Sequence, residues 1–197
     1  MSKTADAKYR LGPKFISYGR VLVSRRSLVE LVEPYLKKLR SMFHETFYLG
    51  VLNTNGKVII THMEAGDSPD SLVTRIGFEL DAHTNPMGKV LLAYLDPPMR
   101  ASIIDRMTFH VYTPSTITTP EELYPILEET RRQGYCIDDA QRAEGIGAVA
   151  VPVFGRNDRC VATISVTCRS EVLQLRGKEM LHELLKAADS ISEHLGM

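Results

Sequence analysis

The segment from Ile146 to Thr167 places the strongest constraint on the fold. Two runs rich in β-branched residues, IGAVAVPVF and RCVATISVT, are separated by only the four residues GRND. Such runs favour strands, and so short a connection joins antiparallel neighbours. A second pair, TFYLGVL and KVIITHM, flanks the turn Asn53–Gly56, whose Asn-Gly step accepts positive φ. An antiparallel sheet is therefore predicted.

Helical segments precede the first hairpin. A helix is expected from Gly12-Pro13 to about Ser24. A second is expected to begin at Ser27, a favourable N-cap with Glu30 at the reciprocal capping position. Apolar residues recur at helical spacing from Leu28 to Phe43. They favour either a face packed on the core or a dimer contact made mainly by the first of the two helices.

Further helices are indicated by local start and stop signals. Pro86 and the Pro97-Pro98 pair suit first helical positions, and Thr119-Pro120 combines an N-cap with a proline start. Gly134 is a natural helix end, and a long amphipathic helix closes the chain. A short strand at 72–76 is expected before an irregular loop that begins at Gly77. The pattern predicts an α+β layered domain.

Composition excludes several classes of function. Lysine plus arginine and aspartate plus glutamate number 24 each, so no overall field draws the chain to nucleic acid or anionic lipid. No apolar run approaches the roughly 20 residues that span a bilayer. The polar start MSKTADAKYR is unlike a signal peptide, and three unevenly spaced cysteines do not form a disulfide framework. These features predict a cytoplasmic protein with reduced thiols.

The helix start at Asn85-Pro86 is a candidate anion site. The first turn of a helix has free N–H groups and the positive end of the dipole. The strand from Val161 to Cys168 alternates, with Thr163, Ser165 and Thr167 on one face. That face is either wetted by solvent or lines a cavity whose hydroxyls hold a carboxylate. Asp138 is either a turn residue or N-cap, or a group that accepts from a ligand hydroxyl or orients a donor.

No catalytic or metal-binding set is recognisable. The three cysteines, Cys136, Cys160 and Cys168, lie in strand-like contexts and resemble small buried hydrophobic residues. The histidines show no HExxH, no cysteine pair has zinc-finger spacing, and the glycines form neither GxGxxG nor a P-loop. No cofactor, metal or enzymatic activity is therefore expected, and a sensor of a small acid is favoured.

Five blocks of the sequence, taken in order, resemble one known family. They are YRLGPK (9–14), HTNPMGKVLLAYL (83–95), TITTPEEL (116–123), RRQGYCIDD (131–139) and GIGAVAVPVFGRNDRCVATISVT (145–167). Over nearly its whole length the chain resembles the C-terminal effector-binding domain of IclR-type bacterial transcription regulators. The resemblance implies a GAF-like (profilin-like) fold, a curved antiparallel sheet with flanking helices that is preceded by an N-terminal linker helix. It also implies a cavity for a small organic acid.

The resemblance further implies which residues contact that acid. Backbone N–H groups at the helix start hold the ligand carboxylate in the family. This chain departs from the pattern at Pro86, which has no N–H, and at Ala148, where some members have cysteine. Both departures leave room for a larger or aromatic acid. The implied contact residues are Pro86, Met87, Gly88, Asp138, Ala148, Ser165 and Thr167, with Leu72, Leu80 and Ile146 as an apolar wall.

Domain organisation and partners are implied in the same way. Family members have an N-terminal winged helix-turn-helix that this sequence lacks, so DNA contact is expected only through a domain outside the chain. An excised fragment or a natural truncation is expected, with residues 1–26 as wing remnant and interdomain linker helix and 27–197 as effector-binding domain. The implied partners are a small organic acid and further copies of the chain, as a homodimer or tetramer, with no membrane. The alternatives are a ligand-free oligomerisation module and a thiol-dependent enzyme on the same fold.

Overall fold

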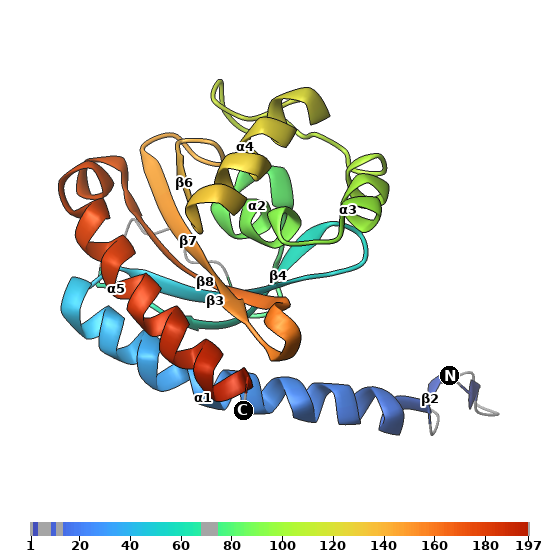
Figure 1. Cartoon of the computed structure of the whole chain (residues 1–197). Coiled ribbons are helices and arrows are strands. Elements are labelled where there is room, and N and C mark those ends of the chain that lie inside the picture. Colours follow the sequence, from blue (N-terminus) through green and yellow to red (C-terminus); the bar gives the residue numbers. More distant parts are fainter. Residues whose placement is uncertain (1, 4–8, 11–13, 68–74, 197) are drawn as a thin grey trace.

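Six antiparallel strands form the sheet that organises the protein (Figure 1). The computed structural model describes residues 2–3, 9–10, 14–67 and 75–196, with side chains described from Leu28 onward. The spatial order is β5-β4-β3-β8-β7-β6, and β1 (Ser2–Lys3) and β2 (Tyr9–Arg10) form a separate pair. The sheet strands are β3 (Thr46–Leu52), β4 (Lys57–Glu64), β5 (Glu79–Asp81), β6 (Cys136–Asp139), β7 (Ile146–Phe154) and β8 (Cys160–Arg169). Both predicted hairpins are present, as β3–β4 and β7–β8.

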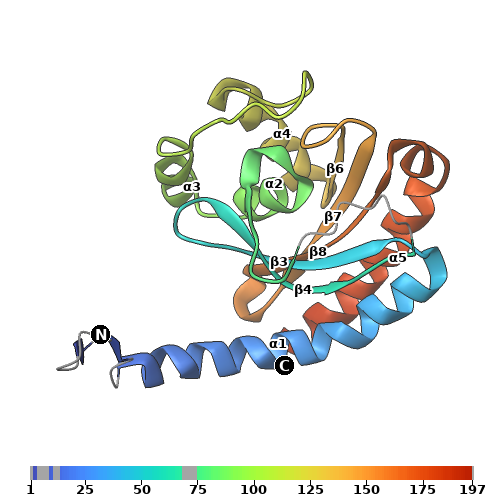
Figure 2. The same ribbon diagram turned by 180° about the vertical axis from the view of Figure 1, so that it is seen from behind.

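Helices cover both faces of the sheet. The long helices α1 (Lys14–Phe43) and α5 (Ser170–Gly196) pack on one face. Over the other face lie α2 (Pro86–Ala93) and α4 (Pro120–Gln133), with α3 (Pro97–Ile104) beside them, as the two opposite views show (Figures 1 and 2). Two short 3₁₀ turns, η1 (Ala82–Thr84) and η2 (Arg156–Asp158), complete the elements. The predicted α+β class, a curled antiparallel sheet with flanking helices, is confirmed.

The alternation of the strands divides the interior into two cores. In β8, Ile164 and Val166 join the core beneath α1 and α5, whereas Thr163 and Ser165 are buried on the opposite face. In β3, Phe47 belongs to the first core and its neighbour Tyr48 to the second, which lies beneath α2 and α4. This period of two follows from the pleat of the strands. The same alternation therefore supplies both the core and the polar face that helices α2 and α4 cover.

The predicted helix boundaries on this second face are confirmed. Helix α2 starts at Pro86, and the side chain of Asn85 caps it. Helix α4 starts at Pro120, and the Thr119 hydroxyl accepts from the Glu122 amide at 3.3 Å. Gly134 ends α4 with φ of 84°, a left-handed conformation that glycine adopts without a Cβ penalty.

Two expectations about individual elements are wrong, and a third falls partly outside the described residues. Helix α1 is continuous through Ser27, so this residue does not begin a second helix. The physical reason is that no glycine or proline interrupts residues 20–33, and a lone serine is too weak a signal to end a helix. Strand β5 at 79–81 occupies part of the expected irregular loop, because it pairs with β4. Of the expected strand at 72–76, Arg75 and Ile76 are not in a strand, and 72–74 lie outside the described residues.

The cap of α4 gives a first testable prediction. Thr119→Ala removes the acceptor for the Glu122 amide and is expected to lower the free energy of unfolding by about 1 kcal/mol. Thermal unfolding followed by circular dichroism should then show a decrease in Tm of roughly 2–4 °C. Thr108→Ala, at an exposed threonine just beyond α3, is the matched control. Equal Tm values for the two variants would contradict the capping role.

Candidate ligand-binding cavity

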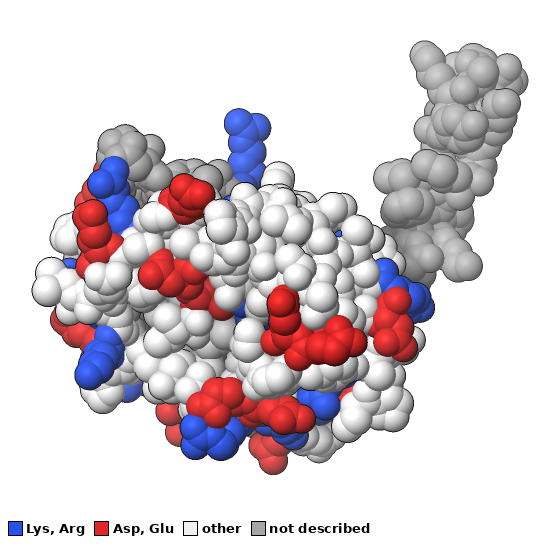
Figure 3. All heavy atoms as spheres, turned by 90° about the horizontal axis from the view of Figure 1, so that it is seen from above, with Lys and Arg blue, Asp and Glu red and all other residues white. Residues whose placement is uncertain are grey.

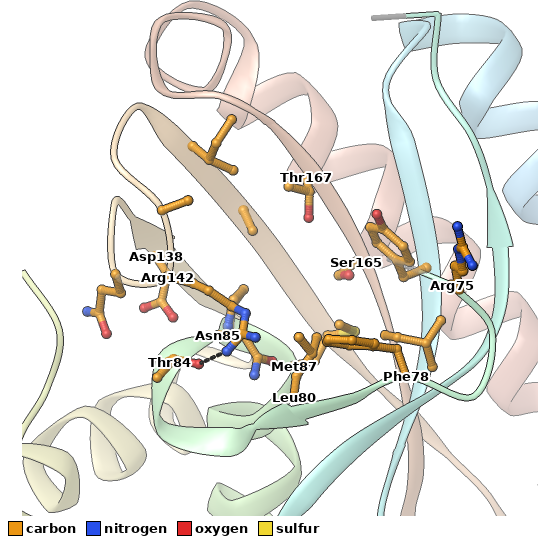
Figure 4. A pocket seen from close by; sticks show the side chains of 17 residues that line it. Arg75, Phe78, Leu80, Thr84, Asn85, Met87, Asp138, Arg142, Ser165 and Thr167 are labelled. Carbon is orange, nitrogen blue, oxygen red and sulfur yellow. Dashed lines mark hydrogen bonds between the residues drawn. The ribbon is translucent and has the colours of Figure 1, made fainter. Parts of the chain in front are cut away.

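A cavity of about 510 Å³ lies between the start of α2 and the polar face of the sheet. Its volume falls within the range of about 300–1,000 Å³ that is usual for small-molecule sites. Its walls come from parts of the chain far apart in sequence, which Figure 4 shows converging on one space. The lining residues are Tyr48, Ile60, Arg75, Phe78, Leu80, Thr84, Asn85, Pro86, Met87, Asp138, Gln141, Arg142, Ala143, Ile146, Ala148, Ser165 and Thr167.

Most of the predicted contact residues meet at this cavity. Those that line it are Leu80, Pro86, Met87, Asp138, Ile146, Ala148, Ser165 and Thr167. Gly88 does not line it, and Leu72 lies outside the described residues. The helix start at Pro86 and the segment around Asp138, which are about 50 residues apart along the chain, thus meet at one cavity, as the sequence patterns indicate.

The start of α2 offers fewer amide donors than expected. The Asn85 side chain accepts the Gly88 N–H at 2.9 Å and donates to the Asp81 carbonyl at 2.8 Å. Gly88 is instead a packing residue, because a Cβ there would lie 2.3 Å from the Ala82 backbone. Pro86 has no N–H. At this helix start the Met87 amide therefore remains as a donor for a ligand.

The polar face of β8 forms the back of the cavity. Ser165 is 1% exposed, and its hydroxyl has no hydrogen-bond partner among the described residues. Thr167 lies two residues further along the same face and also lines the cavity. The alternative of a face wetted by bulk solvent is wrong for Thr163 and Ser165, which are both buried. A buried hydroxyl without a partner is costly, so a ligand that bonded to Ser165 would relieve that cost.

A buried ion pair stands at one end of the cavity. The Lys89 ammonium is fully buried and donates to the two carboxylate oxygens of Asp138 at 2.5 and 2.6 Å. It also donates to the side-chain oxygen of Gln141 at 2.7 Å. Burial raises the pKa of Asp138, and the Lys89 ammonium opposes that rise. Asp138 is thus compensated by a cation, which removes the repulsion that a bare carboxylate would exert on an anionic ligand.

Sequence reasoning did not identify Lys89 as part of this site. A signal was available, because Lys89 is the one charged residue in the apolar helix PMGKVLLA. A lysine rarely occupies a fully buried position without a charged partner. Its position three residues after Pro86 therefore implied a buried carboxylate, although the sequence did not show which one.

An arginine from the β6–β7 connection closes the same end of the cavity. The Arg142 guanidinium lies 4.4 Å from the Tyr112 ring centroid. It also donates to the Thr84 hydroxyl at 3.4 Å (Figure 4). Among the described residues, no carboxylate forms an ion pair with Arg142. Stacking on an aromatic face orients a guanidinium while most of its N–H donors stay available.

The ring beneath Arg142 is itself held in place. The Tyr112 hydroxyl donates to the Asp81 carboxylate at 2.6 Å. Lys57 and His110 contact the same carboxylate at 3.0 and 3.2 Å. Burial alone would raise the pKa of Asp81, but the bonds from Tyr112, Lys57 and His110 lower it to about 2. Asp81 therefore remains ionised and anchors the platform on which Arg142 rests.

The other end of the cavity is apolar with a basic rim. Phe78, Leu80 and Met87 form a hydrocarbon surface, and Figure 4 places Arg75 beyond them on the side away from Arg142. Arg75 is exposed at the rim, and no described carboxylate pairs with it. The cavity thus combines two guanidinium groups that no described carboxylate pairs with and one acidic residue, Asp138, that Lys89 compensates.

The cysteines do not provide a nucleophile. Burial raises the pKa of Cys136, Cys160 and Cys168 to about 12, so each is a neutral thiol near pH 7. No group of three histidine, cysteine or acidic side chains with metal-binding geometry occurs within the described ranges. His83 is fully buried, hydrogen-bonded to the His110 carbonyl at 3.1 Å and packed on Phe109, which is a structural role.

The surface carries no concentrated charge on the face that Figure 3 shows. Acidic and basic side chains are interspersed there around a broad uncharged area, consistent with the equal totals of 24 each. Nucleic-acid-binding surfaces instead concentrate lysine and arginine on one face. Among the described residues, no helix is long and apolar enough to cross a membrane.

Comparison with known proteins identifies relatives of this chain. The family model "Bacterial transcriptional regulator IclR C-terminal" matches residues 21–193. The transcriptional regulator XynR of Escherichia coli K12 is 30% identical over 192 residues, covering 97% of this chain and 76% of XynR. The solved C-terminal domain of E. coli KdgR superimposes with a TM-score of 0.78 at 29% identity, over 86% of this chain and 99% of that one. A double mutant of the PobR inducer-binding domain from Acinetobacter, crystallised with 3-hydroxybenzoic acid, shares the fold with a TM-score of 0.74 at 24% identity, over 83% of this chain and 96% of that one.

The buried ion pair gives a second prediction. Lys89→Met leaves Asp138 buried without its cation, which is expected to cost roughly 3–5 kcal/mol of unfolding free energy in urea denaturation near pH 7. Adding Asp138→Leu should restore most of that loss, because no buried charge then remains unpaired. Lys178→Met, at an exposed site on α5, is the control.

The same variant should also change the dependence of stability on pH. Without Lys89 the folded-state pKa of Asp138 rises further, while the unfolded chain ionises near pH 3.9. The loss of unfolding free energy caused by Lys89→Met should therefore increase as pH rises above about 4 and be smaller at lower pH. A cost that does not vary with pH, or a double variant no more stable than the single one, would contradict the pairing.

Asp81 gives a third prediction. Its folded-state pKa of about 2 lies below the unfolded value near 3.9, so the stability it contributes is complete above about pH 4 and is lost as pH falls towards 2. Asp81→Asn should lower Tm near pH 7 and flatten the fall of Tm between about pH 4 and 2. Asp105→Asn, at an exposed aspartate, is the comparison variant. Parallel pH profiles for wild type and Asp81→Asn would refute the assignment.

Proposed function

This chain belongs to the IclR family of bacterial transcriptional regulators, and on that premise we propose that its cavity senses a small organic acid. As an IclR-type effector-binding domain, the chain would report the presence of this acid to a DNA-binding domain outside the sequence. The relatives are named as transcriptional regulators, and the raised pKa of all three thiols disfavours the thiol-dependent enzyme. The ligand-free oligomerisation module remains the alternative that a binding experiment tests.

The observation that carries the proposal is the buried Ser165 hydroxyl, which lines the cavity and has no hydrogen-bond partner among the described residues. Thr167 and Met87 line the same cavity, where the Thr167 hydroxyl and the Met87 amide are further donors. Hydroxyl and amide donors hold a carboxylate in this way without adding a second charge. The one acidic residue that lines the described cavity, Asp138, is compensated by Lys89. A carboxylate can therefore enter without meeting an uncompensated negative charge.

The size of the cavity favours an acid larger than two or three carbons. One water-sized group occupies about 30 Å³, so a very small oxoacid would leave most of about 510 Å³ unfilled. Ala148 lines the same cavity with a small side chain, so it leaves room for a larger ligand. An aromatic acid is present in the PobR structure, which has the same fold.

Transmission to DNA would depend on how copies of the chain associate. We expect α1, which runs without a break through residues 26 and 27, to act as the linker between domains and as a dimer contact. Binding at α2 and β8 would then shift a dimer or tetramer between arrangements that present the DNA-binding domains differently. Such coupling requires that the ligand bind the two arrangements with different affinity.

The test is a binding screen with a matched set of variants. Glyoxylate, pyruvate and 3- and 4-hydroxybenzoate are the probes, followed first by thermal shift and then by calorimetry. At 100 times its Kd a ligand adds about 2.7 kcal/mol, which for a chain of this size raises Tm by roughly 5–10 °C. Ser165→Val with Thr167→Val is expected to weaken the acid that binds by roughly 10–100-fold, because two hydrogen bonds to a charged group are lost.

Thr163→Val is the control for this screen. Thr163 is buried on the same face of β8 but does not line the cavity, so its replacement should leave Kd within about twofold. Unchanged affinity in the Ser165 and Thr167 double variant would remove these hydroxyls from the site. A screen in which no acid binds would favour the ligand-free oligomerisation module.

A further inference from the structure

We propose that the effector is an acid with two anionic groups, one held by Arg142 at the start of α2 and the other by Arg75 at the opposite rim. This inference rests on the proposed function and narrows the class of acid to an elongated dianion. It depends on the two guanidinium groups, which lie at opposite ends of one cavity and which no described carboxylate neutralises (Figure 4).

The first anionic group would bind at the polar end. Pro86 has no N–H and Asn85 occupies the Gly88 amide, so α2 alone offers the Met87 amide as a donor. Arg142 compensates for this shortage with a full charge, because its guanidinium lies beside Thr84 at the same helix start. The Tyr112 ring at 4.4 Å keeps the guanidinium in place before any ligand arrives.

The second anionic group would bind at the rim. Arg75 lines the cavity just before Phe78, and its exposure lets it pair with a group that has remained partly hydrated. A planar guanidinium binds a carboxylate through two parallel N–H donors, which gives direction as well as charge. Arg75 can therefore fix the far end of a ligand whose near end is held at α2.

The space between the two arginines suits a hydrocarbon linker. Phe78, Leu80 and Met87 line this part of the cavity, and Ser165 is a buried polar group beside them (Figure 4). When Lys89 is counted together with its partner Asp138, the described residues at the cavity carry an excess of two positive charges, those of Arg75 and Arg142. A monoacid would balance one of these charges, whereas a diacid with an apolar middle would balance both.

Matched pairs of acids test this inference directly. Adipate is compared with hexanoate, and terephthalate with benzoate, because each pair shares its carbon skeleton and differs in one carboxylate. Isothermal titration calorimetry on the 197-residue chain should give a Kd at least tenfold lower for the diacid of at least one pair. Kd values for the two members that are equal within twofold in both pairs would overturn the inference.

Arginine variants locate the two ends. Arg75→Gln should raise the Kd of the diacid to that of the monoacid and leave the monoacid within twofold. Arg142→Gln should weaken both members of a pair, because both would use the polar end. Arg106→Gln, at an exposed arginine outside the cavity, removes one positive charge elsewhere and should leave every Kd unchanged. A diacid preference that survives Arg75→Gln, or that Arg106→Gln also abolishes, would overturn the two-ended geometry.

The outcomes separate this inference from the proposed function. If monoacids bind as tightly as diacids and the Ser165 and Thr167 double variant still weakens binding as predicted above, the sensor stands and the two-ended ligand is wrong. If none of the four acids binds at about 10 mM, tenfold above a weak Kd of about 1 mM, the two-ended ligand is overturned. The acid sensor is then overturned as well only if the probes of the earlier screen also fail to bind.

Discussion

The buried ion pair between Lys89 and Asp138 is the interaction on which the site depends. It joins α2 to the edge strand β6 across 49 residues of sequence, and the ammonium of Lys89 is fully buried. An ammonium in the interior is costly unless its donors are all used, and Asp138 and Gln141 use them here. The pair therefore fixes where α2 begins relative to the sheet, and it leaves the polar end of the cavity without an unpaired carboxylate.

A second set of contacts orders the other side of the same end. Asp81 is the last residue of β5, and its carboxylate contacts Tyr112, Lys57 and His110. Tyr112 in turn supports Arg142, whose guanidinium faces the cavity. The long connection between α3 and α4 is thus held by an ionised group that is itself almost buried. Arg142 is therefore positioned by contacts made outside the cavity, which is a feature of preorganised sites.

Local patterns in the sequence predicted most of the fold. The alternation in 161–168 predicted which side chains of β8 join the core, and the signals at Asn85-Pro86, Thr119-Pro120 and Gly134 predicted three helix boundaries. These features depend on neighbours within four residues, which the sequence states directly. The expected break at Ser27 was wrong because helix continuation is a weak balance of propensities. Strand β5 was missed because three residues carry too little pattern, and its pairing with β4 makes it a strand.

For the candidate site too, the local features could be predicted from the sequence and the long-range contacts could not. The sequence alone determined that Ser165 and Thr167 share a face, that a capped helix starts at Pro86, and, through the family resemblance, that these parts meet. Only the tertiary structure decided that the Gly88 amide is occupied, that Lys89 compensates Asp138, and that Arg75 and Arg142 stand at opposite ends. Burial and ion pairing depend on residues brought together from distant parts of the chain. No local pattern records which charged side chains will find a partner and which will be left to bind a ligand.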